Sequence, residues 1–344
     1  MATSLERLAA AAEGRIIDTI PVFCNLFDQG ARTLGVSIED YFSDGGQVAA
    51  AQIEMLGKYG HDNVWSLFYV GKEAELLGCK GIRFSREGPP NVEDFVIKRY
   101  EDIEKLEVPE SIEAHPAFAE SAKCLDILKR EVGQTTPICA YLTASMSLPA
   151  LLMGMEKWLE LLMLGPVDLR DLLLEKCSAF FRKEIEAYRK AGANVLVYAN
   201  PYGSTDIIPM KMFRALSLKW MRRDLEPGGM DGLVYYVGGA RLNPVIDQVI
   251  GEIGFKTFYP GPQDDIVESM RIIGGRALCA GVINDIRLID WTPDEVRAEV
   301  RRIVEGGLGV GKKFFFGTVV MPYGIPDENI RAMVGAAREF GRCS

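Results

Sequence analysis

The feature that most constrains the fold of this chain is a regular alternation between short apolar runs and longer amphipathic segments. Each run is rich in Val, Ile, Phe and Tyr and is followed by a turn and then by a segment of helical periodicity. Strands that alternate with helices form parallel sheets, and eight such units close into a ring. The sequence therefore predicts an α/β fold, a (β/α)₈ TIM barrel, with residues 1–344 as a single domain. The eight predicted strands are Ile20–Asn25, Asn63–Tyr69, Pro137–Thr143, Asn194–Asn200, Leu233–Val237, Lys256–Tyr259, Ala277–Val282 and Lys313–Val319.

A doubly wound open sheet is the alternative architecture, and the placement of glycines argues against it. No G-x-G-x-x-G motif follows the first strand, where a dinucleotide-binding sheet carries one. The glycine-rich run 306–311 precedes the last strand instead, and we interpret it as a loop between a helix and that strand. Capping patterns mark two helix starts, one at Ser37 and one at Thr292, which is followed by Pro293.

Two segments lie outside the simple repeat. An alanine-rich amphipathic run before the first strand predicts an N-terminal helical extension. Between the second and third strands, residues of about 78–132 form an insertion of short extended pieces and charged helices. Its Gly88-Pro-Pro sequence indicates a turn or an extended stretch, because proline fixes the backbone there.

Composition excludes several classes of function. Acidic residues outnumber basic residues 48 to 39, so the net charge of −9 offers no footprint for a nucleic acid backbone. The most apolar helical stretch, 148–165, is interrupted by charges, so we expect no membrane span. Seven scattered cysteines without a C-x-x-C pair argue against a disulfide framework. With no signal peptide pattern at the N-terminus, the sequence predicts a cytoplasmic protein.

In a barrel of this type, the active site lies at the carboxyl ends of the strands. Tyrosines dominate the residues expected there, and they favour an aromatic or amphipathic ligand over a polyanion. Asp28 and Asp206 are candidates to orient a substrate or, if burial raises the pKa, to act as acid or base. Candidate substrate-binding residues are Asp28, Arg32, Tyr69, Tyr141, Tyr198, Tyr202, Tyr259, Asn284 and Met321. The two histidines, His61 and His115, are expected away from this face, so we predict no catalytic histidine in the site.

From about residue 17 to residue 337, the chain resembles the uroporphyrinogen decarboxylase superfamily. The resemblance implies a barrel of the kind predicted above. It also implies membership of one of two branches, decarboxylases of a tetrapyrrole octa-acid or corrinoid-dependent methyltransferases. The stretches that carry the resemblance are Ile20-Pro-Val-Phe, Ala31-Arg32-Thr-Leu-Gly, Tyr59-Gly-His-Asp-Asn-Val-Trp, Glu73-Ala-Glu-Leu-Leu-Gly, Gly88-Pro-Pro, Ala191-Gly-Ala-Asn and Gly324-Ile-Pro-Asp-Glu-Asn-Ile.

Departures from the family patterns decide between the branches. The decarboxylase branch carries an arginine pair that clamps carboxylates, but Asp28 occupies the first arginine position and would repel a polycarboxylate. The methyltransferase branch carries a His-x-Cys and a later Cys that bind zinc. Those positions fall on Tyr236, Gly238 and Tyr323, which removes that zinc site. We therefore predict no metal ligands at the family's positions.

The resemblance then implies a methyltransferase component that demethylates a small substrate, such as an aryl methyl ether. Tyr236 and Tyr323 are candidate catalytic proton donors to the leaving oxygen. Since no corrinoid-binding domain is visible in the sequence, the cobamide would be carried by a separate corrinoid protein that docks over the barrel mouth.

Three alternatives stay open at this point. One is a decarboxylase of a smaller acid, with Arg32 as anchor and Asp206 as acid or base. Another is a catalytically silent binder of a corrinoid or tetrapyrrole. A third is zinc bound by other ligands, such as Cys279 with Asp264. Whether the barrel is a monomer or a homodimer is also open.

Overall fold

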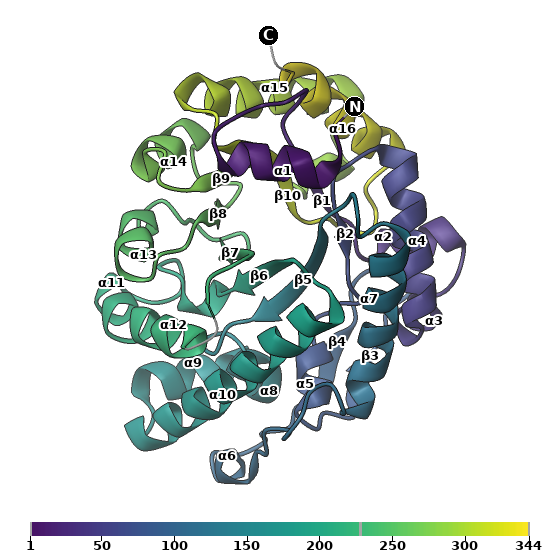
Figure 1. Ribbon diagram of the computed structural model, residues 1–344. Coiled ribbons are helices and arrows are strands. Elements are labelled where there is room, and N and C mark those ends of the chain that lie inside the picture. The colour runs from purple at the N-terminus through teal and green to yellow at the C-terminus, as the bar shows by residue number, and fades with distance from the viewer. Residues whose placement is uncertain (1, 227–228, 343–344) are drawn as a thin grey trace.

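Eight parallel strands form the centre of the molecule, and helices surround them (Figure 1). The computed structural model describes residues 2–226 and 229–342. Within that part of the chain, neighbouring strands follow the order β1-β10-β9-β8-β7-β6-β5-β2. Every strand lies inside its predicted range or extends at most one residue beyond it, although β2 is much shorter than predicted. The predicted TIM barrel is confirmed. The strands are β1 (Val22–Asn25), β2 (Val64–Trp65), β5 (Ile138–Thr143), β6 (Val195–Ala199), β7 (Leu233–Tyr236), β8 (Thr257–Tyr259), β9 (Leu278–Ile283) and β10 (Phe314–Val320).

The seam between β1 and β2 is closed largely by side chains. The backbone N–H of Val22 donates to Asp62 Oδ2 at 2.8 Å, and the N–H of Asp62 donates to the carbonyl of Val22 at 2.7 Å. One residue further along, the side chain of Asn63 accepts from the N–H of Cys24 at 2.8 Å. The two side chains satisfy backbone groups that a longer strand ladder would otherwise pair.

The outer ring of helices follows the predicted alternation. Both predicted helix starts are confirmed, since the side chains of Ser37 and Thr292 cap the helices that follow them. The helices after β1 and β2 are α2 (Gln29–Leu34), α3 (Ile38–Ser43), α4 (Gly45–Tyr59), α5 (Lys72–Leu76) and α7 (Ala119–Glu131). Those after β5 and β6 are α8 (Pro149–Met153), α9 (Met155–Leu164), α10 (Val167–Ala191), α11 (Met210–Met212), the π-helical turn η3 (Phe213–Ser217) and α12 (Leu218–Leu225). The helices after β7, β8, β9 and β10 are α13 (Ile246–Glu252), α14 (Ile266–Ile273), α15 (Pro293–Val310) and α16 (Asp327–Phe340).

The glycine-rich run 306–311 is largely helical, and its interpretation as a loop was wrong. Helix α15 continues through these glycines to Val310. The physical reason is close packing, because a Cβ atom at Gly307 would lie 2.4 Å from the ring of Phe314 on β10. The glycines therefore allow the helix to approach the sheet, which outweighs their low helix propensity.

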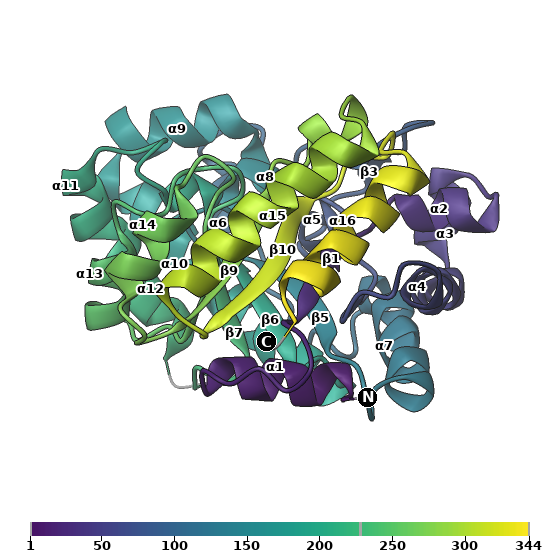
Figure 2. The same cartoon turned by 90° about the horizontal axis from the view of Figure 1, so that it is seen from above.

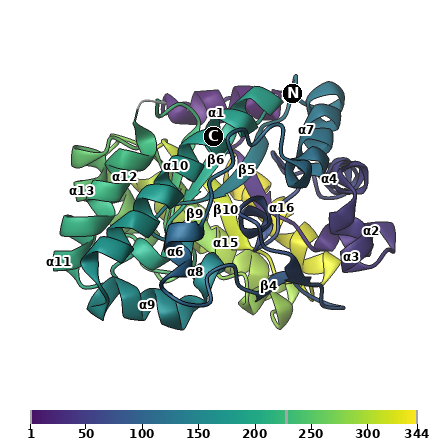
Figure 3. The same cartoon turned by 90° about the horizontal axis from the view of Figure 1, so that it is seen from below.

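The segment predicted as an insertion, 78–132, divides into two parts with different roles. Its first part contains an antiparallel hairpin, β3 (Gly81–Arg83) and β4 (Asn91–Asp94), and helix α6 (Asp102–Lys105), as seen from below in Figure 3. Lys176 on α10 holds the α6 region by donating to the carbonyl oxygens of Ile103, Glu104 and Leu106. The last part, α7, packs against α4 and belongs to the outer ring.

The N-terminal extension is helix α1 (Ser4–Ala12), which crosses the end of the barrel where the strands begin (Figure 2). Thr3 and Glu6 form a capping box at its start. Arg7 fixes the helix to the barrel through Asp18 at 2.8 Å and the buried Asp62 at 3.0 Å. The helix therefore covers one end of the barrel and leaves the other end for the loops that follow the strands.

Six of the seven cysteines are free and buried, as the absence of a disulfide framework predicts, and Cys343 lies outside the described residues. Among the helices of 2–226 and 229–342, none combines the length and apolarity needed to cross a bilayer.

Candidate active site

A pocket of about 250 Å³ lies where the strands end, and we call it the mouth pocket. It is formed by the carboxyl ends of β5, β6 and β10, by the loops after β1, β2 and β6, and by the hairpin that contributes Pro89. This is the end of the barrel at which TIM-barrel enzymes place their catalytic groups. Its lining residues are Phe27, Asp28, Phe68, Tyr69, Val70, Pro89, Tyr141, Thr143, Ser147, Leu151, Ala199, Pro201, Tyr202 and Val320.

Asp28 is the one charged residue among those lining side chains. It directly precedes helix α2, but its carboxylate caps no backbone N–H of that helix. The residue is only 4% exposed, and burial raises its pKa to about 7. A carboxyl group that is half protonated near neutral pH can act as a general acid or base.

A second buried carboxyl group lies behind the wall of the mouth pocket. Glu73 on α5 accepts hydrogen bonds from the backbone N–H of Thr143 at 2.6 Å and from its hydroxyl at 2.8 Å. Burial raises the pKa of Glu73. Glu184 on α10 is also fully buried, neither of its oxygens has a hydrogen-bond partner, and burial together with the charge of Glu73 raises its pKa. The pair concentrates uncompensated acidic groups on this side of the barrel.

Aromatic rings make up most of the remaining wall. The rings of Phe27 and Phe68 pack at a tilt with centroids 5.3 Å apart, and those of Phe68 and Tyr141 pack at a tilt with centroids 4.3 Å apart. Tyr69 donates its hydroxyl to Glu75 at 2.5 Å, and Lys72 forms an ion pair with the same carboxylate at 2.9 Å. The ammonium group of Lys72 is thus held outside the pocket, and the pocket stays flat-walled and largely apolar.

Ser147 and Tyr202 are among the hydroxyl-bearing residues that add polar character to the pocket. Ser147 donates to Asn200 Oδ1 at 3.1 Å and accepts from the backbone N–H of Tyr202 at 3.1 Å, which fixes the loop after β6. The ring of Tyr202 is half-buried and lines the pocket. The mouth pocket therefore combines apolar walls with a few placed polar groups, as small-molecule sites do.

Four of the predicted site residues meet in this pocket: Asp28, Tyr69, Tyr141 and Tyr202. Asp28 was predicted to bind substrate or, with a pKa raised by burial, to act as acid or base, and burial does raise its pKa. The other three supply aromatic walls, as the tyrosine-rich strand ends indicated.

Three predicted residues are held in ion pairs or contacts beside the mouth pocket and do not line it. Arg32 pairs with Asp327 at 2.8 Å and donates to the carbonyl of Tyr323, whose ring it also covers at 5.8 Å. Asp206 pairs with Arg241 at 3.1 Å and accepts from its backbone N–H. The structure therefore does not bring Arg32, Asp206 or Tyr323 to the pocket.

Two further predicted residues serve the backbone near the mouth. The side chain of Asn284 accepts from the N–H of Arg287 at 3.2 Å. Met321 is 1% exposed, and its carbonyl accepts from the side chain of Gln29 at 2.7 Å. Neither residue lines the mouth pocket.

The last three predicted residues point elsewhere because strand residues alternate between faces. Tyr236 and Tyr259 project into the barrel below the mouth pocket and line a larger cavity at the opposite end. Tyr198 projects outward, packs against Phe181 and donates its hydroxyl to Asp224 at 2.6 Å. The assignment of Tyr198 to the substrate pocket therefore does not match the geometry.

Sequence reasoning missed several lining residues. Phe27 and Phe68 were not singled out, although both directly precede or follow chosen positions at strand ends. Pro89 belongs to the predicted insertion and was given no role in the site, yet it lines the pocket from the hairpin. Glu184 carried no usable signal, because it sits in a long, charge-rich helix whose buried face only the fold reveals.

The alternative zinc ligands do not form a site. Asp264 receives three backbone N–H groups at 2.7 to 3.1 Å, which commits its carboxylate to the loop. Cys279 is fully buried, and burial raises the pKa of its thiol, which opposes the thiolate that zinc requires. Across 2–226 and 229–342, no three His, Cys, Asp or Glu side chains are placed to hold a metal ion. The donor set present does not fit zinc.

Comparison with known proteins yields full-length relatives. The chain is 22% identical over 343 residues to the methylcobamide:CoM methyltransferase MtaA of Methanosarcina barkeri, with 97% of each chain covered. It is 23% identical to the methylcobamide:CoM methyltransferase MtbA of Methanosarcina acetivorans, with 98% of each covered. It is 26% identical over 282 residues to a methylated-thiol–coenzyme M methyltransferase of Methanosarcina mazei, which covers 79% of this chain and 71% of that protein. These relatives are methyltransferases.

Solved structures agree on the fold. A methyltransferase from Methanosarcina mazei superimposes with a TM-score of 0.84 at 20% identity and covers 99% of both chains. A B12-independent methionine synthase from Shewanella sp. W3-18-1 superimposes with a TM-score of 0.56 at 13% identity, over 88% of both chains. The model of the uroporphyrinogen decarboxylase (URO-D) family matches residues 3–340. Since that match spans nearly the whole chain, the protein belongs to the uroporphyrinogen decarboxylase family.

Proposed function

We propose that this protein is the methyltransferase component of a corrinoid-dependent system, which removes a methyl group from a small substrate and passes it to a separate corrinoid protein. The observation that carries corrinoid-dependent methyl transfer is the full-length similarity to methylcobamide:CoM methyltransferases, 22% and 23% identical over 97% and 98% of the chain. Their names describe transfer from methylcobamide to CoM, so the direction proposed here, from substrate to corrinoid, rests on the mouth pocket alone. The mouth pocket, which holds one acidic group and no basic group among its lining residues, supports it.

The walls of the pocket favour an aromatic methyl ether as the substrate. Phe27, Phe68 and Tyr141 line the pocket with aromatic rings, against which an aromatic ligand packs well. A carboxylate substrate would meet Asp28 with no cation among the lining residues to neutralise it. Because Arg32 is committed to Asp327, its proposed role as the anchor of a decarboxylase loses support.

Asp28 supplies the proton that the reaction needs. When the bond between the ether oxygen and its methyl carbon breaks, the oxygen keeps the electron pair and leaves as a phenolate. Transfer of the Asp28 proton to that oxygen yields a phenol and an ionised Asp28, which water reprotonates before the next turnover. The electron pair for the new bond to the methyl carbon would come from a reduced cobamide carried by the partner. Tyr236, whose ring meets Tyr141 edge-on at 5.8 Å, positions the inner wall of the pocket.

Exposed apolar side chains in the segments that follow β5, β6 and β9 support docking of a partner on this side of the barrel. Leu164 is 85% exposed after β5, and Ile286 is 65% exposed after β9. Ile207, in the loop after β6, is also exposed. Apolar side chains gathered at one end of a molecule are typical of an interaction surface.

The test follows a labelled methyl group. The protein is incubated with reduced corrinoid protein and a panel of aryl ethers that carry a ¹³C-labelled methoxy group, and the products are identified by NMR. We expect label on the corrinoid and an equal amount of free phenol. Release of carbon dioxide from a panel of carboxylic acids, without methyl transfer, would replace the proposal by a decarboxylase. Corrinoid or porphyrin binding without either reaction would identify a silent binder.

A further inference from the structure

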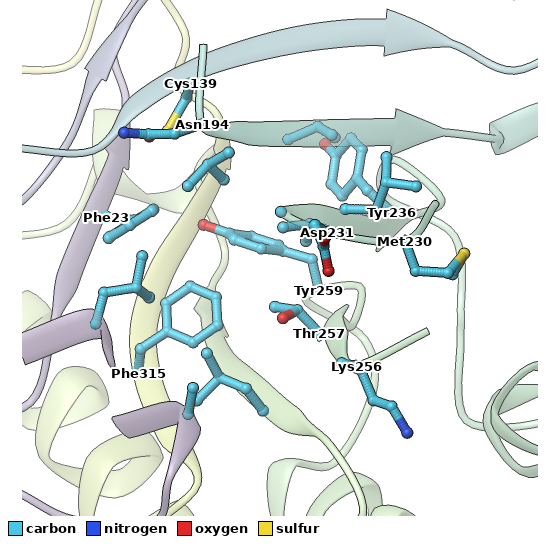
Figure 4. Close-up of a pocket in the computed structure, with 18 of the residues that line it drawn as sticks. Phe23, Cys139, Asn194, Met230, Asp231, Tyr236, Lys256, Thr257, Tyr259 and Phe315 are labelled. Carbon is cyan, nitrogen blue, oxygen red and sulfur yellow. The ribbon is translucent and has the colours of Figure 1, made fainter. Parts of the chain in front are cut away.

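A cavity lies at the opposite end of the barrel from the mouth pocket, and we call it the N-terminal cavity. Its volume is about 730 Å³, within the range of ligand pockets. In TIM barrels this end normally serves stability, and the interior is filled by layers of side chains. A cavity of this size is therefore unexpected there. Figure 4 shows its labelled residues, with Phe23, Tyr259 and Phe315 around the space and Lys256 extending away from the rings.

Aromatic rings enclose the upper part of the N-terminal cavity. Phe23 meets Phe315 edge-on at 5.4 Å, and Phe315 meets Tyr259 at 5.7 Å. Tyr259 in turn meets Tyr236 at 5.7 Å, and Tyr236 meets Tyr141 at 5.8 Å. Tyr141 lines both cavities, so its ring is part of the wall that separates the N-terminal cavity from the mouth pocket. The hydroxyl of Tyr259 is bound to the carbonyl of Thr318 at 2.7 Å, which holds this ring in place.

Helix α1 forms the cover of the cavity at the other side. Leu5 and Leu8 line it from the helix, and the ion pairs of Arg7 hold the helix against the barrel. The backbone N–H of Leu5 also donates to the carbonyl of Thr135 at 3.0 Å. These contacts fasten the cover to the barrel at defined points.

The polar groups of the cavity lie toward its rim. Asn194 uses its carbonyl oxygen to accept from the N–H of Ile138 at 2.9 Å, and its amide NH₂ stays available. Thr257 adds a hydroxyl group. Asp231 and Lys256, both exposed, bring one charge of each sign, so the rim has no net charge that would select an ion. Neutral hydrogen-bonding groups therefore set its polarity.

We propose that the N-terminal cavity is a second small-molecule site, for a largely apolar ring compound with a neutral hydrogen-bonding end group. The aromatic interior takes the ring and the rim takes the polar end. The site is distinct from the mouth pocket and does not depend on the proposed methyl transfer.

The test uses 2-naphthol, a flat two-ring compound with one hydroxyl group, as the probe. Because 2-naphthol also fits aromatic walls at the mouth, binding is measured by calorimetry in a Val70→Phe background, which narrows the mouth pocket from a half-buried loop position. In this background we expect one equivalent of probe to bind. Adding Val197→Phe or Val234→Phe, each 7% exposed and lining the N-terminal cavity, should weaken binding at least tenfold.

A third variant protects the test against misfolding. Leu8→Trp fills the same cavity from helix α1 without changing the barrel strands, and it should weaken binding to a similar extent. Melting temperatures establish that each variant is folded. Absence of probe binding in the Val70→Phe background would overturn the proposal. So would undiminished binding in any folded filling variant, because the probe would then lie elsewhere.

Discussion

A buried aspartate lies at each end of the barrel, and the two differ in whether cationic side chains pair with them. At the end covered by α1, Asp62 is fully buried and is paired with Arg7 at 3.0 Å and Arg338 at 2.7 Å, and it accepts from the backbone N–H of Val22. At the mouth, Asp28 is nearly as buried, but burial alone sets its pKa and raises it to about 7. A compensated charge stabilises the fold, whereas an uncompensated one is available for chemistry. The difference separates the structural end from the working end.

Removal of the compensated carboxylate should have the largest effect. Asp62→Ala leaves two arginines without their partner and removes the side chain that closes the seam between β1 and β2. We expect a loss of about 3 to 5 kcal/mol in the free energy of unfolding, measured by urea denaturation. Asp126→Ala, at an exposed position on α7, is the control and should change stability by less than about 0.5 kcal/mol. Equal small losses in both variants would erase the comparison.

Removal of the uncompensated carboxyl should act on catalysis instead. Asp28→Asn keeps the shape of the side chain but cannot donate a carboxylic proton. We expect kcat for methyl transfer to fall about 100-fold or more, with KM changed only a few-fold, as steady-state kinetics would show. Asp126→Asn should leave both constants unchanged. An Asp28→Asn enzyme that keeps its full kcat would remove Asp28 from the mechanism.

Two tyrosines on neighbouring strands differ in what their hydroxyl groups contribute to stability. Tyr198→Phe removes a hydrogen bond of 2.6 Å to the buried Asp224 and should cost about 1.5 to 3 kcal/mol of stability. Tyr236→Phe keeps the ring that packs against Tyr141 and removes a hydroxyl that does not line the mouth pocket, so it should change both turnover and stability little. Thermal melts and kinetics of both variants test the pair. A stability loss confined to Tyr236→Phe would reverse the assignment.

Because Glu184 is buried, we expect the free energy of unfolding to depend on pH. Its pKa lies well above the ordinary value of 4.5, so the folded protein is destabilised as the pH rises from that value through the raised pKa. Glu184→Gln cannot ionise and avoids this loss. Relative to wild type, the variant should therefore become more stable as the pH is raised from 5 to 8.5, and urea denaturation at the two pH values measures the difference. A difference that stays constant across this range would show that Glu184 does not titrate.

The sequence was sufficient to predict the strands, because each run was long enough to reveal its alternation with helices. It could not predict which tyrosines reach the site. Tyr235 and Tyr236 are adjacent on β7, yet Tyr235 stacks with Tyr198 outside the barrel and Tyr236 points inside. A shift of one residue exchanges the two faces of a strand, and a run that is apolar on both faces gives no signal for the register.

Arg32 and Asp206 do not reach the mouth pocket, for a different reason. Arg32 lies on α2 after β1 and Asp206 in the loop after β6, but their partners Asp327 and Arg241 are 295 and 35 residues away in the sequence. Such pairings depend on the closed barrel and cannot be read from local patterns. Asp28 was placed correctly at the mouth, while its burial, which gives it a chemical role, followed only from the packing of β1 and α2.

The most direct test of the difference between the two ends is the pH dependence of the methyl transfer rate in wild type and in Asp28→Asn. The proton donor is active while Asp28 is protonated, and its pKa is about 7. The wild-type rate should therefore be constant below pH 6 and fall as the pH rises through 7, approaching tenfold per unit, while the much slower Asp28→Asn enzyme shows no such decline. A wild-type rate that stays constant up to pH 9 would contradict the account.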